Sequence, residues 1–149
     1  MAKRRRLLAV VDTNVFVANF LTRSSESFNR RLIRSWMIER KFTLLLSVQI
    51  VDEYLRIFEE RLGFDAQHTA RWRKRFGDRG MTRRVVVRRK LVVSRDPKDD
   101  VFLATARAGK SLFVVSNDRD LLEVSKPQQQ KLGLEIVRPE RYLEYLAQN

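Results

Sequence analysis

Acidic residues follow apolar segments at four places in this chain, and at each place the pattern predicts the end of a strand or the start of a helix. An apolar strand followed by a carboxylate and a helix puts the acid at the carboxyl edge of a parallel sheet, where open α/β folds bind ligands. Four carboxylates at one edge repel one another unless a cation binds between them, and hard divalent cations prefer oxygen ligands. The pattern therefore predicts a metal site made by Asp12, Glu53, Asp99 and Asp118.

The charge of the chain indicates which substrate such a metal would serve. The formal net charge is +13, and the segment from Thr69 to Arg95 holds eleven Lys or Arg against one acid, Asp78. Such a basic surface attracts polyanions, because phosphate contacts by Lys and Arg give sequence-independent affinity. Metal-dependent cleavage of nucleic acid is the chemistry that this combination suggests. The residues expected to bind RNA are Arg71, Arg73, Lys74, Arg75, Arg83, Arg84, Arg88, Arg89 and Lys90.

The residue types that are missing narrow the chemistry further. The chain has no cysteine and one histidine, His68. Disulfides, thiolate metal sites and imidazole-based zinc sites are therefore excluded, and so is ribonuclease chemistry that depends on a pair of histidines. Any metal must bind through oxygen, which favours Mg²⁺, Mn²⁺ or Ca²⁺ over zinc or copper.

Short apolar runs alternate with amphipathic segments along the chain. Strands are expected at 7–11, 42–46, 112–115 and 134–137, and helices at 13–21, 26–41, 48–61, 65–76, 99–108, 118–123 and 139–146. Ser47 is expected to cap the helix that follows it, and Gly63 to mark the end of that helix. Strands that alternate with helices indicate a mostly parallel sheet covered on both faces.

The segment 77–95 is the hardest part to interpret. Either 85–87 or 91–93 can form a strand, with the basic residues 88–90 as a loop between them. Asp96 is expected to cap the next helix, with Pro97 at its first position and Gly109 at its end. Asp120 is expected to be a solvated acid.

Length and composition point to one doubly wound α/β domain over 1–149, since two halves would be too small for good cores. It would carry a basic N-terminal extension at 1–6 and a basic insertion or helix–loop region at 65–95. The apolar run 7–11 is too short for a signal peptide, and no stretch has the length of a membrane span. We therefore expect a soluble, cytoplasmic protein.

Each of the four acids also has a purely structural explanation. Asp is a good helix N-cap, and acids in a first turn complement the helix dipole. Taken alone, Asp99 or Asp118 fits a cap better than a ligand. Glu53 does not fit this explanation, because it lies six residues past Ser47, almost two turns into its helix. The joint pattern therefore favours a shared site.

Four segments in this order resemble the PIN domain, a small doubly wound α/β nuclease fold. They are VVDTNVF, LSVQIVDEYLRIF, DPKDDVFLATARAG and VVSNDRDLL. The resemblance runs from about Leu7 to the last expected strand and is strongest to the PIN-type toxins of prokaryotic toxin–antitoxin pairs. The segment 65–95 lies outside these motifs.

The resemblance implies an endoribonuclease dependent on Mg²⁺ or Mn²⁺, with Asp12, Glu53, Asp99 and Asp118 as its acidic residues. Asn14 and Ser116 match polar positions that would orient these carboxylates or a water. Asp99 is preferred to Asp100 from its spacing to the apolar residues that follow. A toxin of this kind would have a cognate antitoxin and often forms a homodimer. These partners, like the toxin role, are implied by the family alone.

Aromatic residues within the basic segment have two interpretations. Trp72 and Phe76 lie among arginines and could stack on unpaired bases. Because they are four residues apart, they are better explained as the apolar face of a helix.

Other classes of function fit less well. A binding module would use the basic face for RNA without catalysis, and a housekeeping role in RNA processing is a further alternative. A phosphorylated signalling domain needs an acid at the end of a later strand, but the second strand ends in Leu46 and Ser47. A dinucleotide enzyme needs a glycine-rich turn after the first strand, which this chain lacks.

Overall fold

A five-stranded, entirely parallel sheet forms the centre of the computed structural model, which describes residues 7–149. Its strands are β1 (Leu7–Val11), β2 (Phe42–Leu46), β3 (Thr82–Arg84), β4 (Phe113–Val115) and β5 (Glu135–Val137). Their order across the sheet is β3-β2-β1-β4-β5. The two strands that precede Asp12 and Asp118 are therefore neighbours, and the register pairs Val11 with Val115 at their ends.

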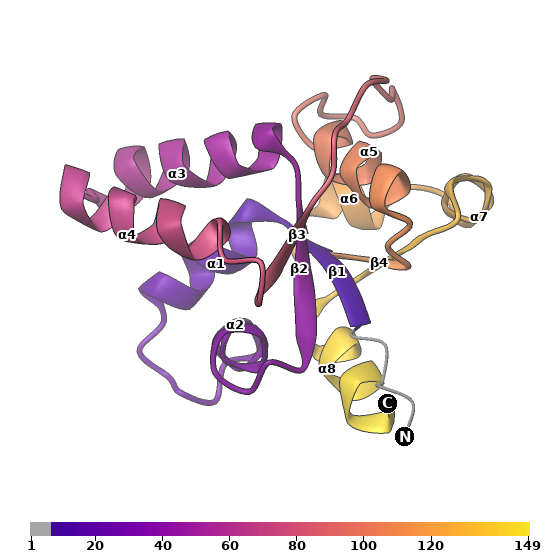
Figure 1. Cartoon of the computed structure of the whole chain (residues 1–149). Helices are drawn as coiled ribbons and strands as arrows, with labels where there is room; N and C mark the ends of the chain where they lie inside the picture. Colours follow the sequence, from indigo (N-terminus) through magenta and orange to yellow (C-terminus); the bar gives the residue numbers. More distant parts are fainter. Residues whose placement is uncertain (1–6) are drawn as a thin grey trace.

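Helices cover both faces of this sheet (Figure 1). The helices α1 (Thr13–Leu21), α2 (Phe28–Met37), α3 (Val48–Leu62) and α4 (Ala66–Phe76) lie on one side, and α5 (Asp100–Gly109) lies on the other with α6 (Arg119–Leu122) and α7 (Lys126–Leu132). The last helix, α8 (Pro139–Gln148), packs against α2 and β4. The expectation of a doubly wound α/β fold is confirmed. No helix among residues 7–149 has the length and apolar character needed to cross a bilayer.

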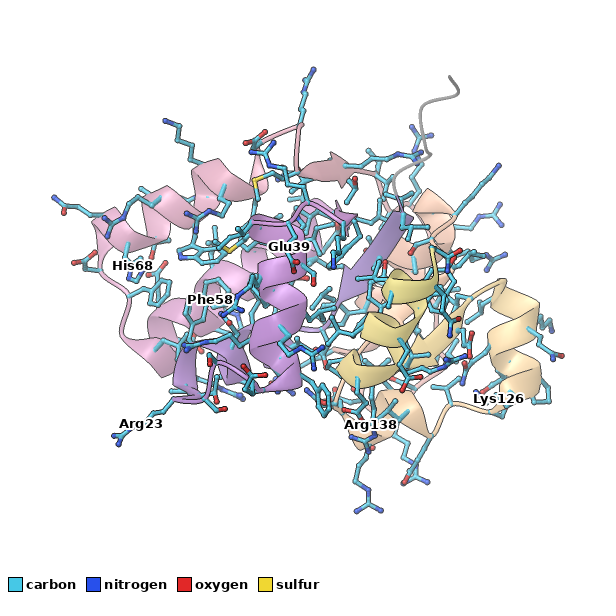
Figure 2. The ribbon with its side chains drawn as sticks, turned by 90° about the horizontal axis from the view of Figure 1, so that it is seen from below. Arg23, Glu39, Phe58, His68, Lys126 and Arg138 are labelled. Atoms are coloured by element: carbon cyan, nitrogen blue, oxygen red, sulfur yellow. The ribbon has the colours of Figure 1, made fainter. Side chains whose placement is uncertain are left out.

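An aromatic cluster fills the space between the sheet and helices α1 to α4. Phe16 of α1 is fully buried, and the centroid of its ring lies 4.8 to 6.1 Å from the centroids of five other aromatic rings. These rings belong to Trp36, Tyr54, Phe58, Trp72 and Phe76. Figure 2 shows Phe58 enclosed by this group of helices.

Trp72 and Phe76 belong to this core rather than to a surface that could stack on bases. Trp72 is 5% exposed and Phe76 is fully buried. Arg75 covers one side of the Trp72 ring, with its guanidinium carbon 4.5 Å from the ring centroid. The interpretation of these residues as the apolar face of α4 is confirmed.

Helix α5 lies close to the sheet because Gly109 has no side chain. A Cβ atom at this position would overlap the side chain of Leu45 in β2. The chain leaves the helix one residue later at Lys110, which adopts a left-handed backbone with φ of 55°. Gly109 is the last residue of the helix, as expected, and it also permits the close packing against Leu45.

The edge strand β3 was not where the sequence pattern placed it. It is formed by Thr82–Arg84, before both of the apolar runs that were expected to contain it. The Thr82 hydroxyl donates to the carbonyls of Phe76, the last residue of α4, and of Asp78 in the turn that follows. An edge strand can begin with polar residues because one of its sides faces solvent. Leu91 and Val93 pack against the core from an irregular segment.

The start of α5 also differs from expectation. The helix begins at Asp100, Pro97 lies in a turn before it, and Asp99 occupies the N-cap position. Asp96 does not cap the helix, because it lies four residues before Asp100; its carboxylate instead accepts a hydrogen bond from the Lys98 backbone N–H at 3.0 Å. Helix α2 begins at Phe28, two residues later than predicted. Helix α7 was not predicted from the sequence.

Candidate active site

Asp12 lies at the carboxyl end of the central strand. Its backbone N–H donates to the carbonyl of Val115, so the strand pairing continues to the acid itself. The side chain is 3% exposed. Ser116, fully buried at the end of the neighbouring strand, donates its hydroxyl to Oδ2 of Asp12 at 2.7 Å. Two residues that sequence reasoning had singled out are therefore in direct contact, although 104 positions separate them.

The same serine connects Asp12 to Asp118. Its Oγ accepts a hydrogen bond from the backbone N–H of Asp118 at 2.9 Å. Asp118 in turn caps α6, because its Oδ1 accepts from the N–H of Asp120 at 2.8 Å. The structural and functional explanations of Asp118 do not compete, since capping occupies one oxygen and leaves the other available.

Glu53 reaches the same edge from the second turn of α3. Its Oε2 accepts a hydrogen bond from the hydroxyl of Thr13, which directly follows Asp12, at 2.7 Å. Its neighbour Tyr54 is fully buried and donates its hydroxyl to the carbonyl of Val11. These two contacts hold α3 against the end of β1. Thr13 and Tyr54 were not recognised from the sequence, and the only signal for them was their position beside Asp12 and Glu53.

Asp99 and Asp100 are adjacent but have different surroundings. The Oδ1 atom of Asp100 accepts hydrogen bonds from the backbone N–H groups of Val93 at 3.1 Å and Ser94 at 2.7 Å. This carboxylate is used to hold the segment before α5. Asp99 is 6% exposed, and its Oδ2 is buried without a hydrogen-bond partner. Asp99 is thus the member of the pair that has a buried carboxylate oxygen without a hydrogen-bond partner.

The pKa shifts show that the acids influence one another. The pKa of Asp12 is raised to about 6, chiefly by burial and further by the charges of Asp118 and Glu53, against the lowering effect of the Ser116 hydrogen bond. The pKa of Asp99 is raised to about 7 by burial and then by the charges of Asp118 and Asp12. Asp12 is therefore close to Asp118 and Glu53, and Asp99 is close to Asp118 and Asp12, so the four acids gather around the end of β1.

A divalent cation fits the residues at this edge. Every donor is a carboxylate or hydroxyl oxygen, which suits Mg²⁺ or Mn²⁺. The buried, unpartnered Oδ2 of Asp99 is a group whose burial is costly unless something binds it. Within residues 7–149, none of the four acids forms an ion pair with a Lys or Arg, although the chain has 31 of them.

These shifts predict how the stability of the metal-free protein depends on pH. The pKa values of Asp12 and Asp99 are higher in the folded than in the unfolded chain. The stability that their protonation contributes is thus present below about pH 4 and lost as pH rises through 6 and 7.

Urea unfolding in chelator between pH 5 and 8 measures this effect. The double variant Asp12→Asn/Asp99→Asn removes both groups and is expected to show a flatter profile, which separates them from the other titrating residues. Adding Mn²⁺ at pH 8 should restore the stability of the wild type. Parallel profiles for the two proteins would contradict the assignment.

The other polar residues singled out from the sequence are placed differently. Asn14 is exposed on α1, and it acts on Asp12 through its backbone, whose hydrogen bond lowers the pKa of that carboxyl. Arg71, Arg73 and Lys74 are exposed on α4. Arg83 and Arg84 are exposed on β3, which ends at the same sheet edge as β1. Arg88, Arg89 and Lys90 are exposed on the segment that leads from β3 towards α5; the basic N-terminal residues 1–6 lie outside the described residues.

Comparison with known proteins agrees with this architecture. A protein-family model described as "PIN domain" matches residues 8–120, which include all four acids. Among solved structures, the chain is similar to PAE2754 from Pyrobaculum aerophilum, with a TM-score of 0.55 and 16% sequence identity. The match covers 97% of this chain and 91% of that one, and at this identity it concerns the fold. No curated protein matches the sequence.

Proposed function

Because the chain belongs to the PIN domain family, whose members are in general metal-dependent nucleases, we propose that it is an endoribonuclease dependent on Mg²⁺ or Mn²⁺. The observation that carries the proposal is the convergence of Asp12, Glu53, Asp99 and Asp118, with a buried oxygen of Asp99 left unpartnered. Clustered acids that lack cationic partners are costly to keep charged in the folded chain, and a bound divalent cation would offset their charge.

The residues of the chain have distinct parts in this mechanism. Asp12, Glu53, Asp99 and Asp118 would hold the cation. When bound, it lowers the pKa of a water and offsets negative charge on the phosphate. Ser116 fixes the carboxylate of Asp12, and Thr13 fixes that of Glu53, through hydrogen bonds of 2.7 Å each. Partners of this kind set ligand orientation, and their loss typically lowers metal affinity about 10- to 100-fold.

RNA is the substrate that we propose, and its support is the distribution of charge. A cleft of about 340 Å³ lies beside Glu53 and is lined by Gln49, Arg56 and Lys98 among others. The arginines of β3 lie at the same edge of the sheet. Phosphates held at these positions would place the chain of the nucleic acid across the acids. Arg71, Arg73, Lys74 and Arg75 on α4 and Arg88, Arg89 and Lys90 on the segment 85–93 would extend this contact.

The toxin role is proposed on the resemblance to PIN-type toxins. It implies a cognate antitoxin that blocks the acidic edge and a possible homodimer. Coexpression with the neighbouring open reading frame, followed by affinity purification, would recover such a partner. Recovery of this chain alone would count against the pairing.

Cleavage of total cellular RNA in Mg²⁺ or Mn²⁺ tests the nuclease activity directly. The control is Asp118→Asn purified identically, because the amide oxygen can still cap α6 while the charge is lost. We expect the wild type to cut, and chelator or the substitution to abolish cutting. Equal cleavage by both proteins would point to a contaminant and would contradict the site.

A further inference from the structure

A slot lies between α5 and the segment 85–93, which leads from β3 towards that helix. Its volume is about 320 Å³, at the lower end of the range of small-molecule sites in proteins. Apolar side chains form its two walls: Val86, Val87 and Leu91 on the segment, and Ala104 and Ala108 on the helix. The two alanines are four residues apart and share one face of α5, so their small side chains leave the space open.

Both ends of the segment are fixed, so the slot is built into the fold. At one end the backbone N–H of Val85 donates to the carbonyl of Leu46 at 2.8 Å, directly after β3. At the other end Oδ1 of Asp100 accepts hydrogen bonds from the backbone N–H groups of Val93 and Ser94. Asp100 lies one helical turn before the first of the two alanines, so it holds the segment against the same face of α5 that lines the slot.

The charged residues at the slot are all basic. Arg88, Arg89 and Arg107 line it, and all three are exposed. Within residues 7–149, none of them forms an ion pair with a carboxylate, and no acid lines the slot. The surrounding stretch 79–95 contains seven Lys or Arg and no acid. The slot therefore fits a ligand that carries negative charge beside an apolar or flat group.

The position of the slot relates it to the candidate active site. Asp99 occupies the N-cap position of α5, and Arg107 lies eight residues further along the helix, about 12 Å away at 1.5 Å per residue. A stacked nucleic-acid strand carries a phosphate about every 3.4 Å, so a few nucleotides span this distance. Each nucleotide presents a flat base beside a phosphate, and proteins hold unpaired bases between apolar side chains or against arginine. Apolar walls next to three arginines match this combination better than they match an acidic peptide, which has no flat group at each step.

We propose that the slot binds the base of an unpaired nucleotide of the RNA, while Arg88, Arg89 and Arg107 contact the phosphates on either side of it. The inference rests on the proposed function only in taking RNA as the substrate. It adds the apolar walls and Arg107 to the residues that contact RNA. It also requires single-stranded RNA near the bond that is cut, because a base that is paired and stacked in a duplex cannot enter the slot.

The variant Ala108→Leu tests the slot, because it fills the space and changes no charge. Its affinity for a short single-stranded RNA, measured by fluorescence anisotropy in Ca²⁺, should fall roughly 10-fold, since one stacked base typically contributes affinity of this order. Its affinity for inorganic polyphosphate, which has the charge but no bases, should equal that of the wild type. Arg107→Gln should weaken the binding of both ligands. Arg61→Gln is the matched control, because this exposed arginine lies eight residues past Glu53 on α3, and it should bind RNA as the wild type does.

Thermal unfolding of Ala108→Leu should match that of the wild type, because the position is exposed, so a loss of RNA affinity would not be a loss of folding. Equal RNA affinity in Ala108→Leu and the wild type would overturn the inference, and so would an equal loss of affinity for polyphosphate. An acidic peptide containing leucines that binds more tightly than RNA, and only when the slot is open, would make it a protein-docking site instead. If Ala108→Leu loses RNA affinity while the wild type fails to cut RNA, the proposed nuclease fails and the slot stands. Wild-type protein that binds no RNA would overturn both.

Discussion

The variant Asp12→Asn should lose RNA hydrolysis by at least about 100-fold while its affinity for RNA is unchanged or slightly higher. Loss of a group that merely orients a metal ligand typically lowers metal affinity 10- to 100-fold, and a ligand at the centre of the site should cost more. Asp12 lies at the end of the middle strand, with the other three acids around it. RNA affinity depends on the basic residues, which this substitution leaves intact.

Single-turnover cleavage together with equilibrium RNA binding in Ca²⁺ measures both quantities. Glu135→Gln is the matched control, because it removes one acidic charge from an exposed position at the start of β5. If the chain is a nuclease, Asp12→Asn loses turnover and the control variant keeps it. If turnover persists in Asp12→Asn, the site is assigned incorrectly. If neither protein cuts but both bind RNA, the chain is a binding module.

Phe16→Ala should lower the free energy of unfolding by about 3 to 5 kcal/mol. The phenylalanine is fully buried, and five aromatic rings surround it. Truncation removes apolar surface and leaves a cavity that rigid rings cannot fill. A domain of this size is stable by only about 5 to 15 kcal/mol, so the variant should be near the limit of folding.

Denaturation in guanidinium chloride, at fixed pH and in chelator, gives this value. Leu21→Ala is the comparison on the same helix, because that side chain is 67% exposed and should change stability by no more than about 0.5 kcal/mol. A Phe16→Ala variant that loses less than 1 kcal/mol would show that the cluster repacks. The aromatic core would then not be what holds α1 in place.

The sequence was sufficient to predict a parallel sheet with Asp12 and Asp118 at one of its edges, for a physical reason. Asp12 and Asp118 follow continuous apolar runs that can only be buried strands, and parallel strands end at one edge. Ser47 and Gly63 bound α3 as expected: Ser47 accepts from the N–H of Ile50, and Gly63 is left-handed with φ of 69°. Local sequence patterns are sufficient to predict structure where it depends on strand burial and helix capping, which involve residues close together in the chain.

Features that depend on contacts between distant residues could not be predicted in this way. The carboxylate of Asp100 accepts hydrogen bonds from the backbone N–H groups of Val93 and Ser94, which lie in a segment without regular structure. Carboxylate oxygens of Asp96 and Asp120 lie within 4.8 Å of each other, and this proximity depends on how that segment folds against α6. The edge strand β3 is short and carries two exposed arginines, so its pattern has no apolar signal.

The close approach of α5 to the sheet at Gly109 has a consequence for genetics. The glycine lies at the opposite end of the helix from Asp99, about 15 Å away at 1.5 Å per residue. A methyl group there overlaps the buried Leu45 side chain, and where the packed core does not let that side chain shift, the helix and the carboxylates at its other end must move. A selection for cells that survive expression of an active nuclease would therefore return changes at Gly109 together with changes at the acids. Such alleles would lie far from the substrate and still abolish its cleavage.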